Sequence, residues 1–202
     1  MNTVSDTYFS ISAPSEGLYK DRGSRFLAFA RPVEREEEVR EFLESVRREY
    51  HDARHHCYAF RLGLGGGTWR ASDDGEPSGS AGRQILGQID SAGLSDVLVV
   101  VVRYFGGIKL GVPGLIKAYK ESTADALAKA VKVEKAAGRS WNLSFDYGTM
   151  PRVMKALKDL GLQYDGADFG ESCSLRTRVR LSLEESFLSM MESLGVEIEQ
   201  AV

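Results

Sequence analysis

Three carboxylates crowd into one short segment of the chain, SDDGEPSG (residues 72–79). Asp73, Asp74 and Glu76 offer the oxygen ligands that Mg²⁺ prefers, and a phosphate group could complete its coordination. The same composition is typical of a tight turn, in which Asp begins the turn, Gly adopts a positive φ and Pro follows. Because no spaced fourth ligand follows, we predict no resident metal or cofactor and keep Mg²⁺ as an alternative.

All three histidines fall within HDARHHC (residues 51–57). Adjacent residues of a strand point to opposite faces, so His55, His56 and Cys57 cannot close a tetrahedral zinc site among themselves. Histidine titrates near neutral pH, so His55 could serve as a general acid or base, although a structural histidine is the simpler explanation. The candidate catalytic residues are therefore His55, Asp74 and Glu76, and they complete no known catalytic set.

The segment RYFGGIKLGVPGL (residues 103–115) follows the apolar run DVLVVVV and combines cations, glycines and aromatic residues. Successive side chains of residues 97–104 are expected to alternate between the two faces of this strand, and Arg103 is expected where the strand leaves the core. Gly106 and Gly107 permit close backbone approach, and Gly111 leads into a helix whose free N–H groups favour anions. No Lys-Ser or Lys-Thr pair follows Gly111, so the segment is not a Walker A loop. We interpret it as an anion-facing surface, which is compatible with a tightly packed strand–helix connection.

A second cationic feature lies near the C-terminus. Arg176, Arg178 and Arg180 occupy alternate positions of an expected strand, where they could contact nucleic acid or merely discourage strand aggregation. Taken together, the candidate binding residues are Asp73, Asp74, Glu76, Ser78, Arg103, Tyr104, Gly106, Gly107, Lys109, Gly111, Lys117, Arg176, Arg178 and Arg180.

The composition bounds the class of protein. With 202 residues, of which 43% are hydrophobic and 27% charged, the chain predicts a packed globular protein. Its net charge of −3 gives no global attraction to nucleic acid or membrane, so any anion site must be local. No signal peptide or apolar run of membrane-spanning length is visible, and Cys57 and Cys173 suit reduced thiols, so we expect a cytoplasmic protein without a membrane partner.

The elements that must position these residues are a mixture of strands and helices. We expect strands over 7–13, 24–33, 56–63 and 96–102, helices over 34–50, 80–93 and 113–131, a turn region over 14–23 and a loop over 65–82. From residue 140 the pattern becomes βαββαβ, which is the ferredoxin-like plan. We therefore predict an α+β chain with two domains, 1–139 and 140–202.

Four segments in this order resemble the Impact family, in the two-domain form of its YigZ-type bacterial members. They are GSRFLAFARPV (23–33), DARHHCYAFRLG (52–63), SDDGEPSGSAG (72–82) and VVVRYFGGIKLG (100–111). The resemblance implies an N-terminal two-layer α/β domain of the ribosomal-protein type, with a left-handed β-α-β crossover, followed by a ferredoxin-like domain. It also implies a link to translation, because eukaryotic relatives act in translational control during amino-acid starvation, and it brings no enzymatic reaction with it.

These observations leave hypotheses of different classes open. We favour a non-catalytic, translation-linked regulatory protein that binds structured RNA, the ribosome or a translation factor through the cation- and glycine-rich surface around Arg103 and Lys109. The alternative is a metal-assisted enzyme acting on a phosphorylated small molecule or a nucleotide. A third hypothesis is a protein-docking domain that uses Tyr104, Phe105 and Tyr119 as anchors, since aromatic residues near Arg are common at interface hot spots.

Overall fold

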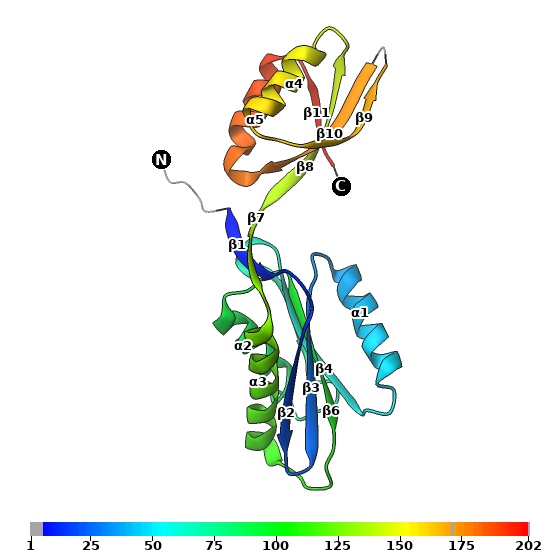
Figure 1. The fold of residues 1–202 in the computed structure, drawn as a ribbon, viewed down its shortest axis with the longest axis vertical. Coiled ribbons are helices and arrows are strands. Elements are labelled where there is room, and N and C mark those ends of the chain that lie inside the picture. Colours follow the sequence, from blue (N-terminus) through cyan, green and yellow to red (C-terminus); the bar gives the residue numbers. More distant parts are fainter. Residues whose placement is uncertain (1–5, 171, 202) are drawn as a thin grey trace. The chain divides into compact units, whose positions relative to one another are not determined.

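A computed structural model describes residues 6–170 and 172–201 of the chain, which divide into two compact units (Figure 1). The first unit comprises Tyr8–Lys135, and the second combines Asp6 and Thr7 with the residues from Ala136 onward. The domain boundary expected after residue 139 falls inside the strand β8 (Gly138–Asp146), whose residues belong together in the second unit.

The first unit is built on a five-stranded sheet in the order β2-β3-β6-β4-β5, in which every neighbouring pair is antiparallel. Its strands are β2 (Ser15–Asp21), β3 (Ser24–Pro32), β4 (His55–Leu62), β5 (Thr68–Ser72) and β6 (Val97–Tyr104). Because β3 and β4 both pair with β6 in antiparallel fashion, they run parallel to each other, and α1 (Glu36–Glu49) connects them. This connection is the expected β-α-β crossover, whose hand stays a prediction.

The central strand β6 is covered on both faces. Its odd-numbered valines, 97 to 101, join the core formed with α2 (Gly82–Ala92) and α3 (Gly111–Lys129). Its even-numbered residues, 98 to 102, join a separate core formed with α1. The α+β class is confirmed, and the predicted alternation of β6 is correct. Helices on both faces make three layers, one more than the two-layer domain that the family resemblance implied (Figure 1).

Two strands of this sheet lie where turns and loop were expected. β2 occupies most of the expected turn region 14–23, and β5 lies within the expected loop 65–82. Both are edge strands, and β5 is largely exposed, so neither has the apolar alternation of a buried strand. Gly17 lets β2 lie against α3, because a Cβ at this position would be 2.4 Å from the backbone nitrogen of Ala126.

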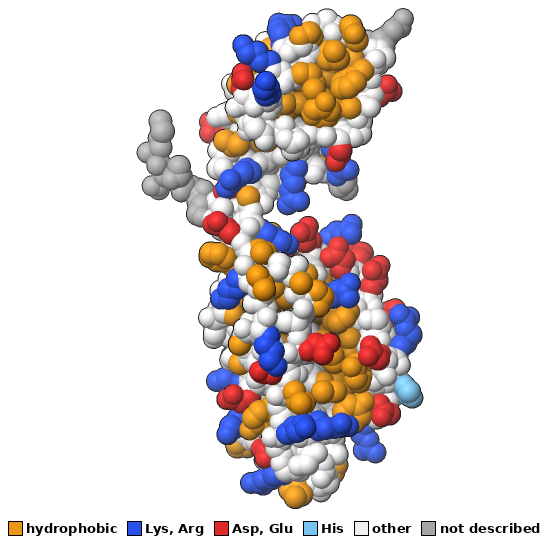
Figure 2. Space-filling view, viewed as in Figure 1, with side chains coloured by type: hydrophobic (Ala, Val, Ile, Leu, Met, Phe, Trp, Pro, Cys, Tyr) orange, Lys and Arg blue, Asp and Glu red, His pale blue; other side chains and the backbone are white. Residues whose placement is uncertain are grey.

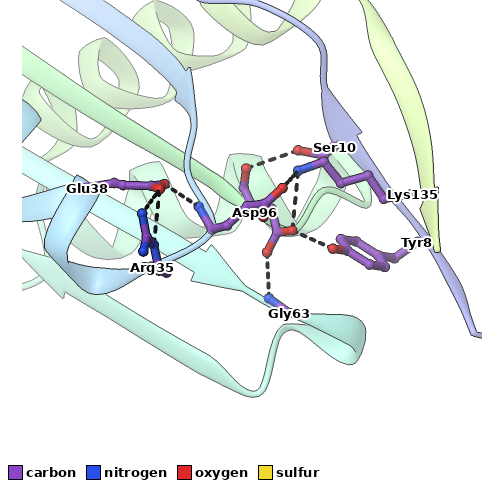
Figure 3. Close-up of polar contacts among 8 residues, drawn as sticks. Tyr8, Ser10, Arg35, Glu38, Gly63, Asp96 and Lys135 are labelled. Carbon is purple, nitrogen blue, oxygen red and sulfur yellow. Dashed lines mark hydrogen bonds and ion pairs between the residues drawn. The ribbon is translucent and has the colours of Figure 1, made fainter. Parts of the chain in front are cut away.

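A two-stranded sheet of β1 (Thr7–Ile11) and β7 (Lys132–Ala136) is tied to the start of β6 by Asp96. The Asp96 carboxylate accepts hydrogen bonds from the Tyr8 hydroxyl and, at 2.7 Å, from the Gly63 N–H, and it lies 3.5 Å from Lys135 Nζ (Figure 3). Its backbone carbonyl accepts a hydrogen bond from Ser10 Oγ at 3.0 Å. This cluster therefore has a structural role at the end of β6 opposite to Arg103.

The second unit has the βαββαβ order that the sequence predicts. Its elements are β8, α4 (Met150–Asp159), β9 (Tyr164–Phe169), β10 (Ser172–Arg180), a 3-10 turn (Leu181–Leu183), α5 (Glu184–Ser193) and β11 (Glu197–Gln200). The sheet order is β11-β8-β10-β9 with antiparallel neighbours, and both helices cover one face. This is the ferredoxin-like topology. Within the described ranges, no helix of either unit is long and apolar enough to cross a membrane.

The loop after β6 folds back onto the turn between β2 and β3. A Cβ on Gly106 would lie 1.9 Å from the carbonyl carbon of Gly23 and 2.1 Å from the nitrogen of Ser24. The Gly106 N–H also donates a hydrogen bond to Ser24 Oγ at 3.0 Å. Glycine at position 106 is therefore required by close packing of two backbones, which fixes the path of the chain just beyond Arg103.

We predict that Gly106→Ala lowers the free energy of unfolding by about 1–3 kcal/mol, because the added methyl group displaces backbone atoms that cannot rotate away. Gly87→Ala is the matched control: it lies inside α2 and its Cβ would meet nothing within 4 Å. We expect this second change to stabilise the protein by about 0.5–1 kcal/mol, since alanine favours the helix. Urea unfolding measures both, and a Gly106→Ala variant as stable as Gly87→Ala would contradict the close approach.

Candidate functional site

A cleft of about 650 Å³ opens at the end of β6. Its lining residues are Asp52, Ala53, Arg54, His55, Arg103, Tyr104, Phe105 and Lys109. They come together because Arg103 pairs in register with His55 of β4 on one side and with Phe26 of β3 on the other. We call this concavity the Arg103 cleft. The cleft places Arg103, Tyr104 and Lys109 on one surface with His55.

Arg103 forms the inner wall of the cleft. Only 10% of its side chain is exposed, and its Nη1 donates a hydrogen bond to Glu76 Oε1 at 2.6 Å. Its guanidinium carbon lies 5.6 Å from the ring centre of Phe26 and 5.8 Å from that of Phe105. Its Nε atom is buried and has no hydrogen-bond partner among the described residues. The guanidinium is therefore held in place while one of its donors stays unsatisfied.

Glu76 is the buried anchor of this arrangement. Its side chain is 3% exposed, and the same Oε1 atom accepts a second hydrogen bond from the Tyr119 hydroxyl at 2.9 Å. Tyr119 in turn accepts a hydrogen bond from the Cys57 thiol at 3.2 Å. Burial raises the pKa of both the Cys57 thiol and the Tyr119 phenol well above their usual ranges, so both groups stay protonated.

These burials bear on two of the sequence hypotheses. Tyr119 is fully buried and cannot be a docking anchor, although Phe105 is exposed and Tyr104 is partly exposed. Glu76 holds Arg103 and Tyr119 in the structure, and its predicted ligand-binding or catalytic role stays a prediction. A buried carboxylate needs such partners because an isolated charge inside a protein is strongly unfavourable.

Asp73 caps the beginning of α2. Its Oδ1 atom accepts hydrogen bonds from the N–H groups of Ala81 at 3.0 Å and Gly82 at 2.8 Å, and its Oδ2 atom accepts one from Gly79 at 2.8 Å. The first N–H groups of a helix have no partners within the helix, so a carboxylate stabilises them. Asp73 is thus used within the protein and does not face the cleft.

Asp74 joins the same loop to β4 and α1. It adopts a positive φ of 42°, and its Oδ2 accepts the His56 N–H at 2.7 Å while its Oδ1 accepts Arg47 Nη2 at 3.2 Å. Its backbone carbonyl lies 2.9 Å from His55 Nδ1, and a carbonyl can only accept, so this bond assigns the proton to Nδ1. His55 is therefore held at the cleft, and in its neutral form Nε2 is the acceptor nitrogen.

The acidic loop thus has a structural explanation for each of its carboxylates. Asp73, Asp74 and Glu76 all accept hydrogen bonds from protein donors. Across residues 6–170 and 172–201, no group of three His, Cys, Asp or Glu side chains is arranged to hold a metal ion. Of the three candidate catalytic residues, His55 alone lines the Arg103 cleft.

The remaining loop candidates do not line the cleft. Gly107 and Gly111 have positive φ values of 90° and 70°, so both positions favour glycine for conformational reasons. Ser78 is exposed on the acidic loop, and Lys117 is exposed on α3. Within the part of the chain described, neither side chain contributes to the wall of the Arg103 cleft.

The arginine row lies in the second unit, on the exposed face of β10. Arg176 is paired in register with Asn142 on one side and with Asp165 on the other, so an acidic residue lies beside it. Arg180 Nη2 donates to Asp6 Oδ1 at 2.7 Å, and this hydrogen bond holds the pKa of Asp6 well below its usual range. Arg180 therefore has a structural partner, and the predicted nucleic-acid contact of this row stays a prediction.

Two charged cleft residues, Asp52 and Arg54, were not singled out by sequence reasoning. Tyr104 donates a hydrogen bond to Asp52 Oδ1 at 2.6 Å, and the Arg25 guanidinium lies 4.9 Å from the Tyr104 ring centre. Arg54 is exposed at the cleft. The segment DARHHC contains Asp52 and Arg54, but only the register of β4 on β6 brings them beside Arg103.

Comparison with known proteins covers both units. A family model described as the Impact N-terminal domain matches residues 22–127. The IMPACT family member YvyE of Bacillus subtilis (strain 168) is 32% identical over 188 residues, which cover 93% of this chain and 87% of YvyE. The IMPACT family member YigZ of Escherichia coli (strain K12) is 38% identical over 138 residues, which cover 67% of this chain and 68% of YigZ.

A solved structure, described as that of a hypothetical protein, covers 98% of this chain and 98% of its own. It is 29% identical to this chain, and the TM-score is 0.74. The likeness therefore extends over both units.

The hydrogen bond to Asp52 raises the pKa of Tyr104 to about 12. The phenol must stay protonated to donate, so this contribution to stability is present below the unfolded pKa of about 10 and is lost as the pH rises through the folded value. We predict that Asp52→Asn shifts the pKa of Tyr104 back toward 10, because the negative neighbour is gone. NMR titration of ring-labelled tyrosine measures this, with Tyr104→Phe to assign the signal. A Tyr104 pKa that is the same in the wild type and in Asp52→Asn would contradict the hydrogen bond between Tyr104 and Asp52.

We predict that Glu76→Ala lowers the free energy of unfolding by about 3–5 kcal/mol, because it leaves the Arg103 guanidinium buried without a counter-charge. Glu76→Leu combined with Arg103→Met removes both charges and should regain part of that loss. Urea unfolding of the single and double variants measures the difference. A double variant less stable than Glu76→Ala would show that the ion pair is not the source of the effect.

Proposed function

Because this chain belongs to the Impact family, we propose that it is a translation-linked regulatory protein that binds RNA through the Arg103 cleft. The family resemblance supports the link to translation, since eukaryotic members act in translational control. We infer a cytoplasmic location and a partner among ribosomal or other structured RNAs. The observation that carries the proposal is the buried, immobilised Arg103 with Lys109 and Arg54 around one concavity.

The charges of the cleft suit a phosphate backbone. The chain as a whole carries a net charge of −3, so a cationic concavity must come from local placement of residues. Arg54 and Lys109 are exposed, while Asp52, the acidic residue of the cleft lining, accepts a hydrogen bond from Tyr104. Arginine and lysine side chains in such positions bind phosphates and release counterions, which makes binding depend on salt.

Glycines and the packed loop keep this surface in place before any ligand arrives. Gly106 packs closely against the turn between β2 and β3, and Arg103 donates a hydrogen bond to Glu76. In Figure 2, Lys and Arg side chains occur over the visible face of the first unit, this end included, with Asp and Glu side chains among them. A site that is ordered before binding loses less conformational entropy when it binds, so even a small cleft can hold RNA selectively.

We predict that Arg54→Gln and Lys109→Gln each weaken binding to ribosomal RNA and each lower the slope of log K against log salt by about 1. Arg103 is left intact, because its removal would also expose the buried charge of Glu76. Lys158→Gln, an exposed lysine of α4, is the matched control and should change neither quantity. Fluorescence anisotropy over a salt series measures affinity and slope together. RNA binding that is independent of salt, or an equal loss of RNA affinity in all three variants, would contradict the proposal.

A further inference from the structure

The loop after β6 exposes large apolar side chains next to its cations. Phe105 is 57% exposed and Ile108 is 54% exposed, while Lys109 follows directly. Large apolar side chains that are exposed close together mark interaction sites, whereas single exposed ones are ordinary. Their place beside the Arg103 cleft indicates a ligand with both an apolar face and a negative charge.

Phe105 is held at the wall of this cleft. Its ring centre lies 5.8 Å from the Arg103 guanidinium carbon, and Arg103 is itself fixed by Glu76. The following residue, Gly106, is packed against Gly23 and Ser24, so the backbone on the C-terminal side of Phe105 has one path. The aromatic ring is thus presented to solvent from an ordered position, which favours stacking.

The chemistry of the cleft distinguishes unpaired nucleotides from duplex RNA. The bases of a duplex are stacked on one another and offer no free face, whereas an unpaired base can stack on an aromatic side chain. Arg54 and Lys109 line the same cleft as Phe105, so a phosphate and a base of one strand could be held together. A cleft of about 650 Å³ lies within the size range of small-ligand sites, about 300–1,000 Å³.

We propose that the Arg103 cleft binds unpaired nucleotides of RNA, with one base stacked on Phe105 and the neighbouring phosphates on Arg54 and Lys109. This inference rests on the proposed RNA-binding function and narrows it from RNA in general to single-stranded segments such as loops and ends. Phe105 is then the residue that distinguishes single strands from duplexes, and the cations contribute to binding of either form.

The test compares a fluorescein-labelled short oligoadenylate with a blunt RNA duplex of equal length, by anisotropy on the full chain. We expect Phe105→Leu to weaken oligoadenylate binding by roughly tenfold, because leucine keeps an apolar side chain but has no ring to stack on. Phe105→Trp should keep the affinity. Phe9→Leu is the matched control, since Phe9 of β1 is 51% exposed and lies outside the cleft, and it should change nothing. Duplex binding should be weaker and should not respond to Phe105→Leu.

The outcomes separate this inference from the function on which it rests. If neither RNA binds, the proposed function fails and the inference fails with it. If both RNAs bind equally well, or if Phe105→Leu leaves oligoadenylate binding unchanged while Lys109→Gln weakens it, the RNA function stands and the stacking role is overturned. In that case the exposed Phe105 ring is available for a protein partner instead. Urea unfolding of each variant confirms that the effects on affinity do not come from loss of the fold.

Discussion

The buried ion pair between Glu76 and Arg103 is the interaction on which the cleft depends. Glu76 comes from the acidic loop, Arg103 from the central strand, and Tyr119 of α3 donates to the same carboxylate oxygen. Neither charge could remain in this position alone, because desolvation of an unpaired ion is far more unfavourable than the pair. Loop, sheet and helix are therefore positioned by one carboxylate, and the geometry of the cleft follows from it.

The charged residues of the first unit fall into two groups with different roles. The carboxylates of one group accept hydrogen bonds from protein donors and stabilise the fold around the cleft; they belong to Asp73, Asp74 and Glu76. Arg54 and Lys109 are exposed on that scaffold and can meet a ligand. The carboxylates of the acidic loop thus hold the backbone in place, and the cations of the cleft are exposed to solvent on that backbone. Such an arrangement suits recognition of anions more than chemistry that needs a free carboxylate.

The sequence predicts the parts of this structure that depend on local pattern. The alternation in β6 assigns both of its faces correctly, and the order of elements after residue 140 identifies the ferredoxin-like unit. β2 and β5 escaped prediction because edge strands lack an apolar alternation. The sequence did not predict that Asp52 and Arg54 line the cleft, because their position there depends on the register between strands far apart in the chain. Composition alone also cannot distinguish a carboxylate that binds Mg²⁺ from one that caps a helix.

The cap that Asp73 forms has a consequence for how the acidic loop behaves in time. Its carboxylate holds the amides of residues 79, 81 and 82 together, so these amides can exchange with solvent only when the loop and the first turn of α2 open as a unit. A segment rich in Gly, Ser and Pro would ordinarily invite proteolytic cleavage. Here the hydrogen bonds of Asp73 hold the chain between β5 and α2 in a turn that does not fit the extended binding groove of a protease, so nicking there would report on opening of this loop.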